Sequence, residues 1–235
     1  MAAVAVAHRG DPYRVRENTL PSLRSAVHRG ADAVEMDVRL TRDGRPVLLH
    51  DATLERLWGD ERALAKFTAR EVRELTGGGV TGLGEGLAAV HATPGVRALI
   101  DLPDASAAPA AVAEVRDHGA GDRVYYCGGA TAMRAVRDRD PDAEIALTWT
   151  TLAPPRPTLL AQLRPRWLNY RFGLLDAALV DRLHADGFLV SAWTADTRRT
   201  MLRLLRLGVD SITTNRIDCL RRAIDTPPRR GRRER

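Results

Sequence analysis

Short runs of aliphatic and β-branched residues recur along the chain, and between them apolar side chains return every three or four positions. The first pattern predicts buried strands and the second predicts amphipathic helices. Helical spacing is clear at Leu175, Leu179 and Leu183. Eight strands are expected, and they span residues 4–8, 33–40, 97–102, 123–127, 144–149, 166–170, 188–193 and 210–214.

From the third strand onward, the strand starts lie 21 to 26 residues apart, which is the length of one strand, one helix and two short loops. Eight such units with parallel strands predict an α/β fold, a single (β/α)₈ TIM barrel. An open, doubly wound sheet is the alternative. No Gly-x-Gly-x-x-Gly motif follows the first strand, so the sequence predicts no dinucleotide site.

The second and third strands break this rhythm, because their starts at 33 and 97 are too far apart for one unit. Asp43-Gly44 is a strong tight-turn signal, and an apolar run follows it. We therefore expect a small hairpin insertion after strand two, which carries His50 back toward the end of that strand. The barrel is expected to occupy residues 1–225.

Composition narrows the class of protein. The chain has 235 residues, 44% of them hydrophobic, and no apolar segment approaches the roughly 20 residues that cross a bilayer. The start is too short for a signal peptide, so we expect a cytoplasmic protein. Cys127 and Cys219 have neither zinc nor disulfide spacing and are interpreted as core residues.

The net charge of +6 comes largely from arginines in residues 226–235. Two prolines followed by charges predict a disordered basic tail there. Weak contact of this tail with polyanions or a membrane surface is the alternative, and no specific nucleic-acid partner is expected. The sequence does not predict the oligomeric state.

Three acidic residues are candidate metal ligands, because parallel barrels carry their functional groups at the carboxyl ends of strands. Glu35 and Asp37 point to the same face, about 7 Å apart along strand two, and Asp101 ends strand three. Oxygen ligands of this kind suit one divalent cation, Mg²⁺ or Ca²⁺. Alternatively, Glu35 and Asp37 form a structural network with Arg9 or Arg39.

His8 at the end of strand one and His50 on the hairpin are expected to flank that cation. Two imidazoles can act as base and acid at neutral pH, and Arg9 can hold an anionic substrate oxygen. This set suits phosphodiester cleavage better than acyl or hydride transfer. The four remaining histidines are interpreted as structural, since they fall near predicted helix ends: His28, His91, His118 and His184.

Five motifs in a fixed order resemble the glycerophosphodiester phosphodiesterase family. They are His8-Arg9-Gly10, Glu17-Asn18-Thr19, Glu35-Met36-Asp37-Val38, Thr41-x-Asp43-Gly44-x-Pro46-Val47 and His50-Asp51. Trp193-Thr194 and residues 208–214 look like the last two strand ends of that family. The resemblance spans residues 4 to about 224 and is weaker in the middle.

The resemblance implies a (β/α)₈ barrel that hydrolyses glycerophosphodiesters, small-molecule substrates, to glycerol 3-phosphate and an alcohol with a divalent metal. One histidine would assist attack on phosphorus, by way of the substrate's neighbouring hydroxyl in one version, and the other would protonate the leaving alcohol. The implied residues are His8 and His50 for catalysis, Arg9, Glu17 and Trp193 for substrate binding, and Glu35, Asp37 and Asp101 for the metal.

Three positions depart from the family pattern. Asp101 stands where the family usually has Glu, Pro103 replaces a phosphate-binding lysine, and Asp196 replaces the Asn of a Trp-Thr-x-Asn motif. Losing one charged hydrogen bond to phosphate costs about 1.5–3 kcal/mol. Arg171, just after strand six, is a candidate replacement cation. The alternative function is a weakened or inactive family member that binds a phosphorylated ligand or a protein partner.

Overall fold

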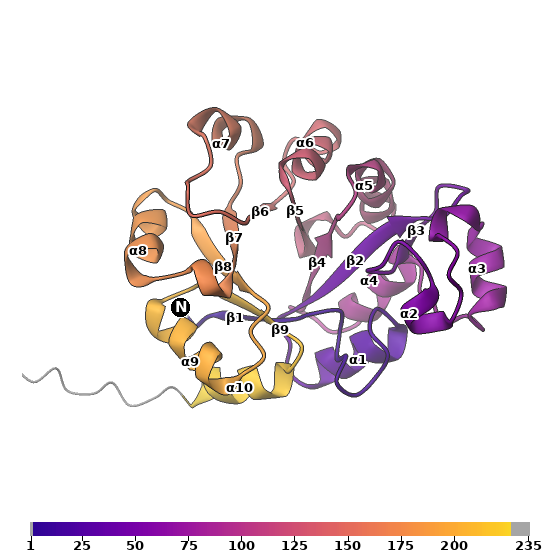
Figure 1. Cartoon of the computed structure of the whole chain (residues 1–235), viewed down its shortest axis with the longest axis horizontal. Coiled ribbons are helices and arrows are strands. Elements are labelled where there is room, and N and C mark those ends of the chain that lie inside the picture. Colours follow the sequence, from indigo (N-terminus) through magenta and orange to yellow (C-terminus); the bar gives the residue numbers. More distant parts are fainter. Residues whose placement is uncertain (1, 227–235) are drawn as a thin grey trace, which may run out of the picture.

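The predicted strands form a closed parallel barrel in the computed structural model, which describes residues 2–226 (Figure 1). β1 pairs with both β9 and β2, and this closure excludes the open doubly wound sheet. The barrel strands are β1 (Val4–Ala7), β2 (Ala33–Leu40), β4 (Arg97–Asp101), β5 (Val124–Gly128), β6 (Ile145–Trp149), β7 (Trp167–Arg171), β8 (Leu189–Trp193) and β9 (Ser211–Thr214).

Helices surround the barrel on its outer side (Figure 1). The α-helices are α1 (Leu20–His28), α2 (Glu55–Trp58), α3 (Ala69–Leu75), α4 (Leu83–His91), α5 (Ala108–Asp117), α6 (Ala130–Arg139), α7 (Pro157–Leu163), α8 (Ala177–Ala185), α9 (Arg198–Leu207) and α10 (Ile217–Asp225). Short 3₁₀ turns are η1 (Leu64–Lys66), η2 (Ala105–Ala107), η3 (Gly121–Arg123) and η4 (Phe172–Leu174).

Local sequence signals set the ends of these helices. The Thr19 hydroxyl caps α1, and the Asp176 carboxylate accepts a hydrogen bond of 2.8 Å from the backbone of α8. Thr68 and Glu71 form a reciprocal capping box at the start of α3. Gly208 ends α9 with a left-handed φ of 82°, which glycine adopts without steric cost.

Side chains alternate between the two faces of each strand, so the buried residues form two cores, one between the barrel and the helices and one inside the barrel. In β4, Ala98 and Ile100 face outward to the helices, whereas Leu99 faces into the barrel. The inward layer at the amino end is apolar and includes stacked rings of Tyr125 and Trp167, with centroids 6.0 Å apart. Because side chains alternate along a strand, the next inward positions toward the carboxyl end carry the polar groups of the candidate site.

The insertion after β2 is larger than the predicted hairpin. β3 (Pro46–Leu48) pairs antiparallel with β2 as expected, but the inserted chain continues through α2, η1 and α3 before α4 begins. This segment has its own apolar cluster, which contains Leu54, Leu64, Phe67 and Val72. Its helices have only four and seven residues, too short to show a clear helical period in the sequence.

Three further sequence expectations concern membrane spans, the two cysteines and the basic tail. Within residues 2–226, no helix is long and apolar enough to cross a membrane. Cys127 and Cys219 are both buried free thiols, as expected of core cysteines, although Cys127 also lines the cavity described below. The predicted disordered tail lies, except for Thr226, outside the described residues.

Gly10 offers a test of the β1–α1 turn. Its φ is 88°, and an added Cβ would lie 2.6 Å from the carbonyl carbon of Ser22. We expect Gly10→Ala to lower the free energy of unfolding by about 2–4 kcal/mol, through overpacking and left-handed strain together. Urea unfolding measures the change. Gly95→Ala is the matched control, since Gly95 has φ 82° with nothing near its Cβ. Equal losses in both variants would contradict this account.

Candidate active site

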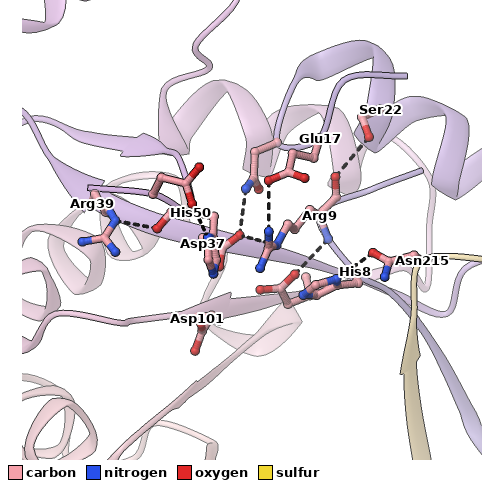
Figure 2. Close-up of polar contacts among 12 residues, drawn as sticks. His8, Arg9, Glu17, Ser22, Asp37, Arg39, His50, Asp101 and Asn215 are labelled. Carbon is pink, nitrogen blue, oxygen red and sulfur yellow. Dashed lines mark hydrogen bonds and ion pairs between the residues drawn. The ribbon is translucent and has the colours of Figure 1, made fainter. Parts of the chain in front are cut away.

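A cavity of about 250 Å³ opens at the carboxyl ends of the strands. Figure 2 shows the polar side chains that meet there. Of the nine predicted site residues, seven line the cavity: His8, Arg9, Glu35, Asp37, His50, Asp101 and Trp193. Glu17 and Arg171 are not among the lining residues.

The three predicted metal ligands lie side by side. Each offers one carboxylate oxygen, and these oxygens lie within 4.8 Å of one another. The strand register produces this, because Asp37 of β2 pairs directly with Asp101 of β4, and Glu35 lies one inward position below Asp37. Burial and the charge of Asp37 raise the pKa of Glu35 well above its usual value. The same two causes raise the pKa of Asp101 to about 6.

The neighbours of this cluster leave oxygens free for a cation. The Arg9 backbone N–H donates to Oε2 of Glu35 at 2.8 Å, and the Asn18 amide donates to Oδ2 of Asp37 at 2.7 Å. Arg9 Nε forms an ion pair with the same Asp37 oxygen at 3.1 Å. Among the described residues, no side chain pairs with Oε1 of Glu35 or Oδ1 of Asp37. A hard divalent ion therefore fits the donor set.

The alternative was that Arg9 or Arg39 pairs with Glu35 and Asp37 in a structural network, and the structure contains only part of that network. Arg9 does pair with Asp37, but Arg39 turns away and donates from Nε to the backbone carbonyl of His50 at 2.7 Å (Figure 2). Within residues 2–226, Glu35 and Asp101 form no ion pair with an arginine or lysine. Two of the three acids thus have no cationic side chain to offset their charge when they ionise.

His8 follows β1 and is held by the loop after β9. Its Nδ1 lies 2.7 Å from Oδ1 of Asn215, and the Asn215 amide nitrogen donates to Asp196 at 2.8 Å. Burial, followed by the charge of Arg9, lowers the pKa of His8 below its ordinary 6.5. His8 is therefore held by a neutral amide and favours the uncharged form.

His50 has a charged partner. Its Nδ1 lies 2.7 Å from Oδ1 of the neighbouring Asp51, and its side chain is 43% exposed. Burial alone would raise the pKa of Asp51, but hydrogen bonds from Arg56 and His50 outweigh it and lower that pKa. A carboxylate can only accept, so Nδ1 of His50 carries the hydrogen of this contact.

Arg56 connects the insertion to the cavity. It lies in α2 and donates to Oδ2 of Asp51 and to Oε1 of Glu17, both at 2.6 Å. The same Glu17 oxygen accepts from Nη1 of Arg9 at 3.0 Å. Glu17, predicted to bind substrate, thus lies behind the cavity and orients Arg9. A continuous chain of hydrogen bonds and ion pairs runs from His50 to Asp37 through these side chains.

The remaining predicted residues, Trp193 and Arg171, end the neighbouring strands β8 and β7. Trp193 is half-buried at the end of β8, and its indole N–H has no hydrogen-bond partner within the described structure. Arg171 ends β7 at the exposed rim. Six lining residues were not predicted as site residues: Leu99, Cys127, Thr148, Asn169, Thr194 and Thr213. Of these, Thr148 and Asn169 are hydrogen-bonded to each other at 3.1 Å. Both are polar residues at inward strand positions, which is the signal that could have found them.

The four other histidines lie away from the cavity. They occupy the last turns of α1, α4 and α8 and the cap of α5, and none of them lines the cavity: His28, His91, His118 and His184. Their positions agree with a structural role at helix ends.

Comparison with known proteins decides the family. The family model for the glycerophosphoryl diester phosphodiesterase family matches residues 8–219. The chain belongs to this family. It is therefore a phosphoric diester hydrolase, the enzyme class that the motifs predicted.

Two named relatives match this chain over nearly its whole length. It is 26% identical over 231 residues to a "Glycerophosphodiester phosphodiesterase" of Caldanaerobacter subterraneus, covering 92% of this chain and 95% of that protein. It is 31% identical to "Probable glycerophosphodiester phosphodiesterase 2" of Mycobacterium tuberculosis, covering 93% and 89%.

Solved structures share the fold. A phosphodiesterase of Oleispira antarctica, in complex with the product sn-glycerol-3-phosphate, superposes with a TM-score of 0.85 at 24% identity. The match covers 96% of this chain and 98% of that one. A glycerophosphodiester phosphodiesterase of Thermotoga maritima gives 0.82 at 22% identity, covering 94% and 99%.

The raised pKa of Asp101 predicts how stability depends on pH. A carboxyl whose folded pKa lies above its unfolded value binds more protons when folded, so its contribution to stability is lost as pH rises from about 4 through about 6. With a chelator present, we expect this group to cost about 1–3 kcal/mol at pH 8 relative to pH 5, measured by urea unfolding. Mg²⁺ or Ca²⁺ should restore that stability at pH 8.

The lowered pKa of His8 makes stability rise with pH, which opposes the effect of Asp101. The effect of Asp101 is therefore isolated by comparing the unchanged chain with a variant of that residue. Asp101→Asn should be more stable than the unchanged chain at pH 8 in chelator and should lose the gain from the cation. If the two proteins show the same pH dependence and the same cation effect, the cluster is not the source of either.

Proposed function

We propose that this phosphodiesterase hydrolyses glycerophosphodiesters to glycerol 3-phosphate and an alcohol, within lipid metabolism, with one divalent cation and two histidines. The observation that carries this proposal is the cavity itself, where three carboxylates converge. Its two imidazoles have different hydrogen-bond partners, a neutral amide at His8 and a carboxylate at His50. The product found in the Oleispira antarctica relative supports the substrate class.

Glu35, Asp37 and Asp101 would hold the cation, either Mg²⁺ or Ca²⁺. When bound, the ion would supply positive charge that polarises a phosphoryl oxygen. Arg9 lines the same cavity with a guanidinium that Glu17 and Asp37 hold in place, so it can orient an anionic substrate oxygen without first losing its own freedom.

The hydrogen-bond partners support an assignment of base and acid. His8, facing a neutral amide, would accept a proton from the attacking water as the water oxygen bonds to phosphorus. His50, facing the Asp51 carboxylate, would hold a proton and give it to the alcohol oxygen as the bond from phosphorus to that oxygen breaks. Each turnover then leaves the two histidines with exchanged proton states, which solvent restores.

Phosphate binding depends on few cations in this chain. Pro103 supplies no charge, and among the described lining residues Arg9 is the one arginine or lysine. We therefore propose weaker retention of phosphate than a site with a second cation would give. Arg171 at the rim stays a predicted substrate contact, and a cytoplasmic location stays a prediction from the sequence.

Replacement of either histidine tests the assigned chemistry. His8→Ala and His50→Ala should each lower kcat for glycerophosphocholine by about 10²–10⁴-fold, the usual worth of general acid or base catalysis. Release of glycerol 3-phosphate in Mg²⁺ or Ca²⁺ is the measurement. His118→Ala, at the cap of α5, is the matched control and should keep full activity. Activity that survives both cavity changes would refute the roles, and binding without turnover in the unchanged chain would favour a non-catalytic member.

Arg56→Ala tests the ion-pair chain that reaches His50 from the insertion. It removes the partner of both Asp51 and Glu17, so we expect kcat to fall about 10-fold while the free energy of unfolding changes by less than about 1 kcal/mol, as for most exposed ion pairs. Arg62→Ala is the control, because Arg62 forms an ion pair with Asp60 and lies over the Phe67 ring, both on the same insertion, and does not line the cavity. Equal effects on kcat would show that the Arg56 contacts do not position the site.

A further inference from the structure

We infer that Asn215 and Asp196 act together as positioning residues which keep the proton of neutral His8 on Nδ1, so that Nε2 is the nitrogen left free to accept a proton. This inference rests on the proposed function and adds the residues that make His8 a base. Neither residue was among the predicted catalytic or substrate contacts, and neither lines the cavity.

The donors and acceptors around His8 can be assigned starting from backbone N–H groups, which can only donate. The Arg216 N–H donates to the Thr214 hydroxyl oxygen at 3.0 Å, so the hydroxyl hydrogen points elsewhere, toward Oδ1 of Asp196 at 3.1 Å. The Asn215 backbone N–H also donates to Oδ1 of Asp196, at 2.8 Å. The Asp196 carboxylate therefore acts as an acceptor for everything around it.

This polarity orients the Asn215 side chain. Its amide nitrogen donates to Oδ2 of Asp196 at 2.8 Å, which leaves the amide oxygen facing His8. The opposite rotation would place an amide oxygen against a carboxylate oxygen, two acceptors with no hydrogen between them. An amide oxygen cannot donate, so the 2.7 Å contact requires a hydrogen on Nδ1 of His8.

The backbone holds the two partners at this separation. The His8 N–H donates to the Thr214 carbonyl at 2.9 Å, and the Ala195 N–H donates to the Thr213 carbonyl at 2.9 Å. The ends of β1, β8 and β9 are thereby tied together. A neutral imidazole in water favours the hydrogen on Nε2, so the pair holds His8 in the tautomer that is less stable in solution. Other charged groups that act on His8 are Arg9 and Asp37.

The tautomer can be read directly from the unaltered chain. Long-range ¹H–¹⁵N correlation NMR on protein labelled at histidine nitrogens distinguishes the two neutral forms, and His8→Gln identifies the signal by its loss. We expect the His8 spectrum above neutral pH to show hydrogen on Nδ1. A hydrogen on Nε2 would overturn the inference.

Two substitutions then test whether the pair is the cause. Asp196→Asn should let the Asn215 amide rotate, shift His8 toward the Nε2–H form, and lower kcat by about 10–100-fold with little change in KM. Adding Asn215→Asp to that variant restores an acceptor for His8 and a donor for position 215, so the Nδ1–H form should return and kcat should recover. Failure of the double variant to restore the tautomer would overturn the proposed cause.

Asp210→Asn is the matched control, because Asp210 also accepts from a backbone N–H and from a histidine, Val190 and His184, away from the cavity. It should change neither the His8 tautomer nor kcat. The spectrum also separates this inference from the proposed function. Absence of glycerophosphodiester hydrolysis with the Nδ1–H form present would reject the function alone, whereas hydrolysis with the Nε2–H form would reject the inference alone.

Discussion

Mutual repulsion among three closely spaced carboxylates is the constraint around which the site is built. The register of β2 and β4 places Asp37 opposite Asp101, and alternation adds Glu35 to the same face, so the barrel cannot close without bringing these charges together. Arg9 offsets part of the repulsion at Asp37, and the rest appears as raised pKa values at Glu35 and Asp101. Such an arrangement is stable at neutral pH when positive charge enters it, which ties folding and the proposed cation site to one another.

The two histidines differ because different parts of the chain support them. His8 is part of the barrel itself and is backed by an amide whose orientation Asp196 sets. His50 belongs to the insertion and is backed by the Asp51 carboxylate, which Arg56 ties to the β1–α1 loop. In the proposed mechanism, the barrel supplies the histidine that accepts a proton, and the insertion supplies the histidine that donates one. An insertion that looks peripheral in Figure 1 is in this way part of the proposed catalytic arrangement.

The sequence was sufficient for features that depend on periodicity. Spacing of the strands predicted the closed barrel, and alternation in β2 predicted that Glu35 and Asp37 share a face, because both follow from repeating local geometry. The sequence could not predict contacts between irregular segments. Glu17 contacts Arg9 and Arg56 instead of lining the cavity, and the Asn215–Asp196 pair joins two loops that alternation cannot place.

The central claim, that the three acids share one cation, is tested most directly by anomalous diffraction from crystals of the full chain soaked in Mn²⁺. The account predicts a single strong peak within coordination distance of one oxygen each from Glu35, Asp37 and Asp101. A map with no peak there, or with Arg9 occupying the space between these carboxylates in place of an ion, would contradict it.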